Sequence, residues 1–301
     1  MDRVTAVRRR PNPYATLSPT ERLELELSSG EAFAVFVKRL GVRQPGHPDK
    51  REREREPLLY ESLLADPGLP VPRCLGVGRD GAGRAQELYL EHLDGLDLRY
   101  RGLEHWYAAA ARLADLHRRF AARGKLGRGR DFLLALDERY FRKWAERAVA
   151  ATAAIHDGAA ARLARLAERL DPAAALLAAQ PPTLVHNDLS PKNAMAAEHL
   201  EPPRIAFVDW ELAGAGCGAL DVVHLAHGLD PEARRRLFDA YWLRLEGSPL
   251  AIEDRGERAA LLAACELHKT LYRLAHATSL GSDAATVGRW VEEAEFWRAR
   301  L

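Results

Sequence analysis

The stretch LVHNDLSPKNAM, residues 184–195, gathers a histidine, an aspartate and an asparagine around a proline. His186, Asp188 and Asn193 fit the spacing H-x-D-x-x-x-x-N. Asp209 follows in the apolar segment IAFVDWE, and the flanking runs TLVH and RIAFVDW indicate short buried strands. Such a short pattern can occur by chance, and the simplest alternative is that Asp188 or Asn193 caps a turn before Pro191.

Phosphoryl transfer from a nucleotide to a hydroxyl group requires residues of these kinds. One carboxylate must orient the hydroxyl and accept its proton, and a second carboxylate with an amide oxygen must hold Mg²⁺ on the phosphates. An H-x-D followed by an asparagine and then by D-W-E is the arrangement of catalytic and metal-binding loops in kinases. The two aspartates together therefore favour the catalytic interpretation.

Composition excludes several other classes of protein. The 301 residues are 47% hydrophobic and 29% charged, enough for one large domain or two moderate ones. A formal net charge of +1 gives no reason to expect nucleic acid or an anionic membrane as partner. Three distant cysteines indicate neither a disulfide framework nor a zinc site, which favours a reducing cytoplasm. The N-terminus lacks the apolar core of a signal peptide, and no window reaches the roughly 18 apolar residues of a membrane span.

Hydrophobic periodicity divides the chain into a β-rich part and a helical part. RLELEL and AFAVFVKRL alternate as two strands of a hairpin joined by the turn SSGE, and PGLPVPRCLGVG and AQELYLEHL indicate two more strands. DKREREREPLLYESLLA, from Asp49, has a helical pattern. Beyond Asp94 the helical period dominates, with a strongly amphipathic run LEHWYAAAARLADLHRRFAAR. Further helices are predicted near 133–155, 158–179, 231–246, 254–280 and 283–300.

These motifs resemble those of the aminoglycoside phosphotransferase and choline kinase-like family, small-molecule kinases that share the protein-kinase fold. The resemblance is carried by LVHNDLSPKNAM, by IAFVDWELAGAGCGALDVVHLA and by RLADLH, and it extends in order from about Glu21 to His227. It implies an α+β, two-lobed protein kinase-like fold. Residues 1–92 would form a small β-rich nucleotide-binding lobe, and residues 93–301 a larger, mainly helical lobe with the catalytic loop and the acceptor site.

The resemblance assigns roles to the motif residues. Asp188 would be the catalytic base, and Asn193 and Asp209 would bind the metal. His186 would organise the loop without carrying a proton. Asp221 would hydrogen-bond the catalytic loop from the start of a buried helix, and a plain helix N-cap is the alternative for this residue.

Lys38, at the end of AFAVFVK, corresponds to the family's nucleotide-phosphate lysine, although a lysine can simply mark a strand end. Its partner would be a glutamate on the following helix, either Glu56 or Glu61. The spacing to PGLPVPRCLGVG favours Glu56. Main-chain atoms near Glu91 and Leu93, in LYLEHLDG, would contact the nucleobase.

The chain departs from the kinase pattern where a glycine-rich loop normally covers the phosphates. Only SSGE, residues Ser28–Glu31, offers a glycine, and it is the turn that leads directly into the lysine strand. PNPYATLSPT, residues 11–20, is the alternative phosphate loop and contains no glycine.

The resulting hypothesis is an O-phosphotransferase that uses ATP and Mg²⁺ to phosphorylate a small molecule, either an antibiotic or a metabolite. One alternative is a kinase for serine or threonine of a peptide in natural-product biosynthesis, and another is a catalytically inactive pseudokinase. Residues 211–301 hold fourteen acidic and eleven basic side chains, a balance too even to indicate a polycationic acceptor. The sequence indicates neither the acceptor nor the oligomeric state.

Overall fold

The structure is a computed structural model that describes residues 2–12, 19–40, 47–50, 52–122, 126–129, 131–197 and 204–301. The chain forms two compact units. Unit 1 comprises Met1–Arg112, Leu126–Leu134 and Pro191–Ala213, and unit 2 comprises Leu113–Lys125, Ala135–Ser190 and Gly214–Leu301. The LVHNDLSPKNAM stretch is therefore divided, with Asp188 in unit 2 and Asn193 in unit 1. The lobe boundary between residues 92 and 93 stays a prediction.

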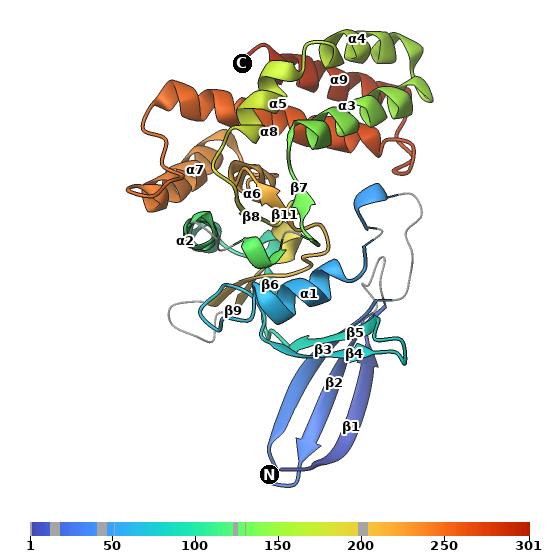
Figure 1. Ribbon diagram of the computed structural model, residues 1–301, viewed down its shortest axis with the longest axis vertical. Coiled ribbons are helices and arrows are strands. Elements are labelled where there is room, and N and C mark those ends of the chain that lie inside the picture. The colour runs from blue at the N-terminus through green and yellow to red at the C-terminus, as the bar shows by residue number, and fades with distance from the viewer. Residues whose placement is uncertain are drawn as a thin grey trace. The chain divides into compact units, whose positions relative to one another are not determined.

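Among the described residues, unit 1 contains a five-stranded antiparallel sheet with the strand order β1-β2-β3-β5-β4 (Figure 1). Its strands are β1 (Val4–Pro11), β2 (Thr20–Leu27), β3 (Ala32–Arg39), β4 (Cys74–Arg79) and β5 (Ala85–Glu91). Strands β2 and β3 form the predicted hairpin, whose turn contains Gly30 at φ 88°, a conformation that glycine adopts without strain. The structure also shows the two further strands that the sequence predicted.

Strand β1 was not predicted from the sequence. It is an edge strand whose residues are all exposed, so it has no alternation of buried and exposed side chains. Cross-strand ion pairs join it to β2, such as the bond from Arg9 Nε to Glu21 Oε2 at 2.8 Å. Pairing of this kind depends on the neighbouring strand and leaves little signal in the local sequence.

Helix α1 (Arg55–Ser62) is shorter than the predicted helix. The structure has a 3₁₀ turn at Pro48–Lys50, and the α-helix begins only at Arg55. Pro57 explains the difference, because in a longer helix its ring would clash with the carbonyl four residues earlier, whereas proline is tolerated in a first turn. Leu59 and Tyr60, which are fully buried, anchor α1 in the core of unit 1.

A second, three-stranded sheet in unit 1 carries the two loops with the motif residues. Its order is β10-β9-β6, with β6 (Leu96–Asp97), β9 (Ala194–Ala197) and β10 (Arg204–Phe207). Strands β9 and β10 pair antiparallel, with Ala194 opposite Phe207. Asn193 and Asp209 therefore lie just beyond the same end of this strand pair.

Unit 2 is mainly helical. Helix α2 (Leu103–Ala121) begins in unit 1 and ends in unit 2. The other helices are α3 (Glu138–Ala153), α4 (Asp157–Ala167), α5 (Asp171–Ala178), α6 (Ala219–Leu225), α7 (Pro231–Leu245), α8 (Arg255–Ala275) and α9 (Ala284–Arg298). Helices α3, α4, α8 and α9 pack together, as Figure 1 shows. A small sheet has the order β7-β11-β8, with β7 (Leu134–Ala135) at the boundary of the two units and with β11 (Gly214–Gly216) and β8 (Thr183–Val185) in unit 2. Strand β8 leads into the segment with Asp188.

The helix predicted at 158–179 is two helices in the structure. Helix α4 ends at Ala167, and α5 begins at Asp171 with Pro172 in its first turn. A continuous helix would place the proline ring against the carbonyl of Glu168, which breaks the helix at this point. Most other predicted helices are confirmed. Several begin after an aspartate whose carboxylate accepts backbone N–H groups, and Asp230 does so for α7.

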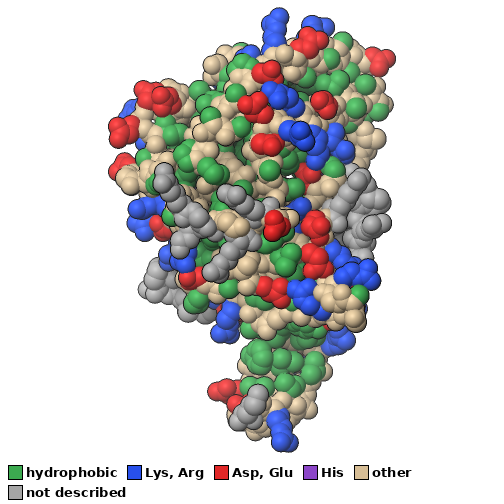
Figure 2. All heavy atoms as spheres, in the orientation of Figure 1, with side chains coloured by type: hydrophobic (Ala, Val, Ile, Leu, Met, Phe, Trp, Pro, Cys, Tyr) green, Lys and Arg blue, Asp and Glu red, His purple; other side chains and the backbone are tan. Residues whose placement is uncertain are grey.

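Acidic and basic side chains are interspersed on the face of the molecule seen in Figure 2. In the part of the chain that the structure describes, no helix combines the length and the apolar character needed to cross a bilayer.

Gly95 provides a test of the packing in unit 1. A Cβ atom at this position would lie 2.6 Å from the carbonyl oxygen of Ala196 in β9. We expect Gly95→Ala to lower the free energy of unfolding by about 1–3 kcal/mol, because the added methyl group overpacks this contact. Urea unfolding measures the change. Gly76→Ala is the matched control, because a Cβ there meets nothing within 4 Å. Equal stability of the two variants would contradict the close approach of β9 to Gly95.

Candidate functional site

Lys38 is the centre of a buried ion cluster in unit 1. Its Nζ donates to Glu56 Oε2 at 2.7 Å and to Asp209 Oδ1 at 2.5 Å. The side chains of Lys38 and Glu56 are almost fully buried, whereas that of Asp209 is 34% exposed. A buried ammonium group requires such partners, because without them its desolvation costs several kcal/mol.

Electrostatics keeps this lysine charged. Burial alone would lower the pKa of Lys38, but the carboxylates of Glu56, Asp209 and Glu211 outweigh burial and hold the pKa well above its ordinary value. Burial raises the pKa of Glu56, and the Lys38 ammonium opposes that shift. The cluster therefore presents a permanent cation between two acidic side chains.

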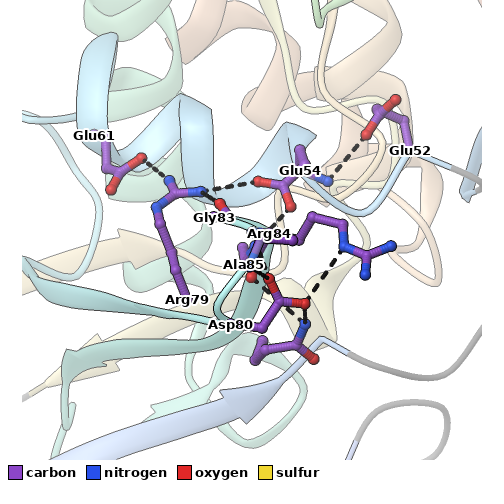
Figure 3. Close-up of polar contacts among 10 residues, drawn as sticks. Glu52, Glu54, Glu61, Arg79, Asp80, Gly83, Arg84 and Ala85 are labelled. Carbon is purple, nitrogen blue, oxygen red and sulfur yellow. Dashed lines mark hydrogen bonds and ion pairs between the residues drawn. The ribbon is translucent and has the colours of Figure 1, made fainter.

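Of the two glutamates considered as partners of Lys38, the structure pairs it with Glu56. Glu61 instead accepts from Arg79 Nη2 at 2.6 Å, on the surface of unit 1 (Figure 3). Glu56 has a second contact, since its Oε1 accepts the backbone N–H of Trp210 at 3.0 Å. Helix α1 is thereby tied to strand β3 and to the segment that follows β10.

Asn193 and Asp209 are brought together in unit 1 by the β9–β10 pair. The carbonyl of Asn193 accepts the N–H of Val208 at 2.9 Å, which extends the strand pairing by one more bond. Asn193 is buried and ends the 3₁₀ turn Pro191–Asn193. Asp209 has φ 68°, in the left-handed region that aspartate tolerates better than most residues. An amide oxygen and a carboxylate oxygen are the hard ligands that Mg²⁺ prefers, so the two residues fit the predicted metal role.

In unit 2, Asp221 organises the backbone of the segment that contains Asp188. Its Oδ2 accepts the N–H of His186 at 2.7 Å, and its Oδ1 accepts the N–H of Asn187 at 2.8 Å. Asp221 Oδ2 also lies 3.3 Å from Nε2 of His117, the last residue of the RLADLH run. Asp221 is fully buried within the first turn of α6, and Gly218 occupies the N-cap position. The N-cap alternative for Asp221 is therefore wrong.

Asp188 is more accessible than its neighbours. It is half-buried, whereas His186, Asn187 and Leu189 are buried. The N–H of Asp188 donates to His186 Nδ1 at 3.3 Å, and its carbonyl accepts from Ser190 at 2.8 Å. The backbone is thus fixed on both sides of an accessible carboxylate, as a positioned base requires. The catalytic role of Asp188 and the organising role of His186 stay predictions.

Asn187 has a structural role that the sequence analysis missed. Its backbone has φ 67°, and its Nδ2 donates to Tyr140 Oη of helix α3 at 2.8 Å. A signal was present, because asparagine is one of the few residues besides glycine that enters the left-handed region readily. Tyr140, 47 residues earlier, left no corresponding signal.

The structure places Glu91 in an ion pair within unit 1. Its carboxylate binds Arg204 at 2.5 and 2.9 Å and accepts the N–H of Arg73 at 3.1 Å, and Arg204 holds the pKa of Glu91 below its ordinary value. The N–H of Glu91 donates to the carbonyl of Arg73 at 2.8 Å, so this group is already bonded within the protein. Leu93 follows β5 and is half-buried. Nucleobase binding by the main chain near these two residues stays a prediction.

The structure describes only one of the two candidate phosphate loops in full. SSGE is the β2–β3 turn, as predicted. The alternative loop at 11–20 falls mostly on residues 13–18, which lie outside the described residues.

The left-handed backbone conformation of Asn187 can be tested by substitution. Asn187→Ala and Asn187→Gly both remove the bond to Tyr140, but only alanine is strained at positive φ. We expect the alanine variant to be less stable than the glycine variant by about 1 kcal/mol in urea unfolding. If alanine proves equal to or better than glycine, the left-handed conformation at Asn187 is wrong.

Asp221 predicts a pH dependence. Burial alone would raise its pKa, but hydrogen bonds with His117 and the His186 amide hold the pKa below its ordinary value of 3.8. The stabilisation from this carboxylate is therefore present above about pH 4 and is lost as the pH falls through the lower folded-state value.

We expect Asp221→Asn to lose about 3 kcal/mol at neutral pH, because a buried charge partner is removed. Its free energy of unfolding should also fall less steeply than that of the wild type as the pH drops below about 4. Urea unfolding of both proteins across this range is the measurement. Parallel curves would show that Asp221 does not supply the acid-sensitive stabilisation.

Comparison with known proteins bears on the family and on the fold. The phosphotransferase enzyme family (APH) matches residues 27–261. No curated protein matches the sequence. A microcompartment-associated aminopropanol kinase has a similar solved structure, with 17% identity and a TM-score of 0.62 over 97% of this chain and 90% of that chain. The GDP complex of wild-type aminoglycoside 2'-phosphotransferase-IIIa is 13% identical, with a TM-score of 0.63 over 99% of this chain and 93% of that chain.

Macrolide 2'-phosphotransferase MphH from Brachybacterium faecium is 16% identical, with a TM-score of 0.57 over 97% of this chain and 91% of that chain. At these identities, the structural likeness shows the fold alone. It confirms the predicted α+β, protein kinase-like fold. The family match covers most of the chain and confirms the resemblance that the motifs indicated. The chain belongs to the phosphotransferase enzyme family.

Proposed function

We propose that this phosphotransferase moves the γ-phosphate of ATP, bound with Mg²⁺, to a hydroxyl group of a small molecule. The observation that carries the proposal is the buried Lys38 ammonium, held by Glu56 and Asp209 in unit 1. A fixed cation bonded to a partly exposed carboxylate suits a metal-bound triphosphate, whose transfer depends on positioning and charge neutralisation.

The donor set suits magnesium. Mg²⁺ usually takes one or two protein oxygens and fills its remaining positions with phosphate oxygens and water. Asn193 and Asp209 supply such a pair. Among the described residues there is no group of three or more histidine, cysteine or acidic side chains that could hold a metal. When bound there, Mg²⁺ would neutralise negative charge on the phosphates.

In the proposed reaction, Asp188 orients the acceptor hydroxyl and receives its proton. The acceptor oxygen forms a bond to the γ-phosphorus, and the bond between that phosphorus and the β–γ bridging oxygen breaks. ADP leaves, and the proton is carried by the Asp188 carboxylate. The hydrogen bonds from Asp221 to the loop amides support this role, because they fix the backbone that carries Asp188.

Small-molecule acceptors are favoured by the proteins of similar fold. Those proteins are named as kinases or phosphotransferases of aminopropanol, aminoglycosides and macrolides, all of which are small molecules. The nucleotide itself would be held by Lys38, by the metal and by main-chain groups near Glu91 and Leu93. ATP is proposed as the donor.

Asp188→Asn tests the assigned base. We expect turnover to fall by about 10²–10⁴-fold, the usual contribution of a positioned general base. Nucleotide affinity should stay within about twofold, because asparagine has nearly the same size and the phosphates are held by other residues. Steady-state kinetics and titration calorimetry with ATP and Mg²⁺ measure the two quantities. A tenfold or smaller loss of turnover would refute the role of Asp188.

A coupled ADP-release assay can identify the acceptor. The wild type and Asp188→Asn are each assayed with amino alcohols, aminoglycosides, macrolides and other hydroxylated metabolites. Acceptor-dependent ADP release by the wild type, absent in the variant, is the expected result. A protein that binds nucleotide but releases no ADP with any member of the panel would count against a small-molecule acceptor, and peptides containing serine or threonine would then be tested.

A further inference from the structure

Arg55 is a buried arginine next to Glu56, and the chemistry described so far gives it no role. It is 4% exposed. Its Nη1 donates to the carbonyls of Asp49 at 2.6 Å and Glu211 at 2.7 Å, and its Nε donates to the carbonyl of Phe132 at 2.9 Å. All of these residues belong to unit 1. An arginine on an ordinary helix surface keeps its guanidinium in water, whereas this one is bound to backbone carbonyls, two of them in segments distant in sequence.

The neighbouring residues Arg55 and Glu56 bind the first and the third peptide groups that follow Asp209. Glu56 Oε1 accepts the N–H of Trp210, and Arg55 donates to the carbonyl of Glu211. Lys50 adds an ion pair with the Glu211 carboxylate. The start of helix α1 thus binds this segment through one acceptor and one donor.

Asp209 needs such support because its backbone is in the left-handed region, at φ 68°. A non-glycine residue keeps this conformation only when the surrounding structure determines it. In this conformation the Asp209 carboxylate accepts a hydrogen bond from Lys38. Loss of an anchor at Glu211 would allow the backbone to relax and the carboxylate to turn away.

We propose that Arg55 is a positioning residue for Asp209. By binding the Glu211 carbonyl, it keeps the Asp209 backbone left-handed and couples helix α1 to the metal-binding loop. The catalytic consequence rests on the proposed function, but the structural role of Arg55 does not.

Arg79, the last residue of strand β4, offers a control because it also binds the α1 region (Figure 3). Its guanidinium binds Glu54 at 3.2 Å, Glu61 at 2.6 Å and the carbonyl of Gly83 at 3.1 Å. Glu54 in turn accepts the N–H of Ala85 at 2.7 Å. Arg79 therefore links α1 to the β4–β5 hairpin through hydrogen bonds, whereas Arg55 links α1 to the segment after Asp209.

The test is hydrogen–deuterium exchange of the unliganded protein, read over residues 207–213. We expect Arg55→Met to raise exchange there by about tenfold or more, because the local structure opens more often. Arg79→Met should leave exchange over 207–213 within about twofold and raise it at residues 80–85 instead. The proposal is overturned if Arg55→Met leaves 207–213 within about twofold of the wild type, or if Arg79→Met raises it equally.

Arg55→Lys covers the case in which the methionine variant does not fold. Lysine keeps the charge but loses the planar set of donors, so it can serve fewer carbonyls. We expect a rise of about threefold or more over 207–213 with the helix otherwise as protected as in the wild type. Wild-type exchange in Arg55→Lys would overturn the proposal.

A functional measurement separates this proposal from the proposed function. The Mg²⁺ concentration for half-maximal turnover should rise about tenfold in Arg55→Met, less in Arg55→Lys and not in Arg79→Met. A rise of the same size in Arg79→Met would overturn the catalytic consequence. If the wild type shows no Mg²⁺-dependent turnover, the proposed function fails, while the exchange result still decides the role of Arg55.

Discussion

The ion cluster of unit 1 depends on one buried cation, Lys38. Its ammonium is out of water and must stay within bonding distance of Glu56 and Asp209, since an unpaired buried charge costs several kcal/mol. Strand β3, helix α1 and the segment after β10 are thereby held in one relative position. These elements are far apart in the sequence, and a change that shifts any one of them also displaces the lysine.

Burial distinguishes a carboxylate that binds the backbone, Asp221, from the two that the proposed reaction uses, Asp188 and Asp209. Asp221 is fully buried, binds backbone amides and has a lowered pKa, which are the properties of a structural anion. Asp188 and Asp209 remain partly accessible, although their backbones are fixed by neighbouring bonds. One buried aspartate thus holds the loop that carries a second, more accessible aspartate.

The sequence predicted those features that leave a local pattern. The β2–β3 hairpin alternates hydrophobic residues, Lys38 ends an apolar strand, and most helices have their period and an aspartate at the start. Features that depend on distant partners were missed. Trp210 donates to Glu56 across 154 positions, and Arg55 binds carbonyls, which every residue possesses, so nothing in the sequence marks its partners. Strand β1 is exposed on both faces and has no pattern of burial.

Backbone strain is common to the loop that contains Asp188 and to the loop that contains Asp209. Among the described residues, Asn187 and Asp209 are the non-glycine positions with positive φ. Asn187 precedes the predicted base Asp188, and Asp209 is itself a predicted metal ligand. Left-handed backbone costs about 1–2 kcal/mol per residue and persists only when other bonds impose it. Asp221 and Tyr140 form hydrogen bonds with Asn187 and hold its left-handed conformation. Next to Asp209, Glu56 accepts the N–H of Trp210. The buried residues around these loops therefore do more than fill the core, because they hold the backbone in conformations that it would otherwise leave.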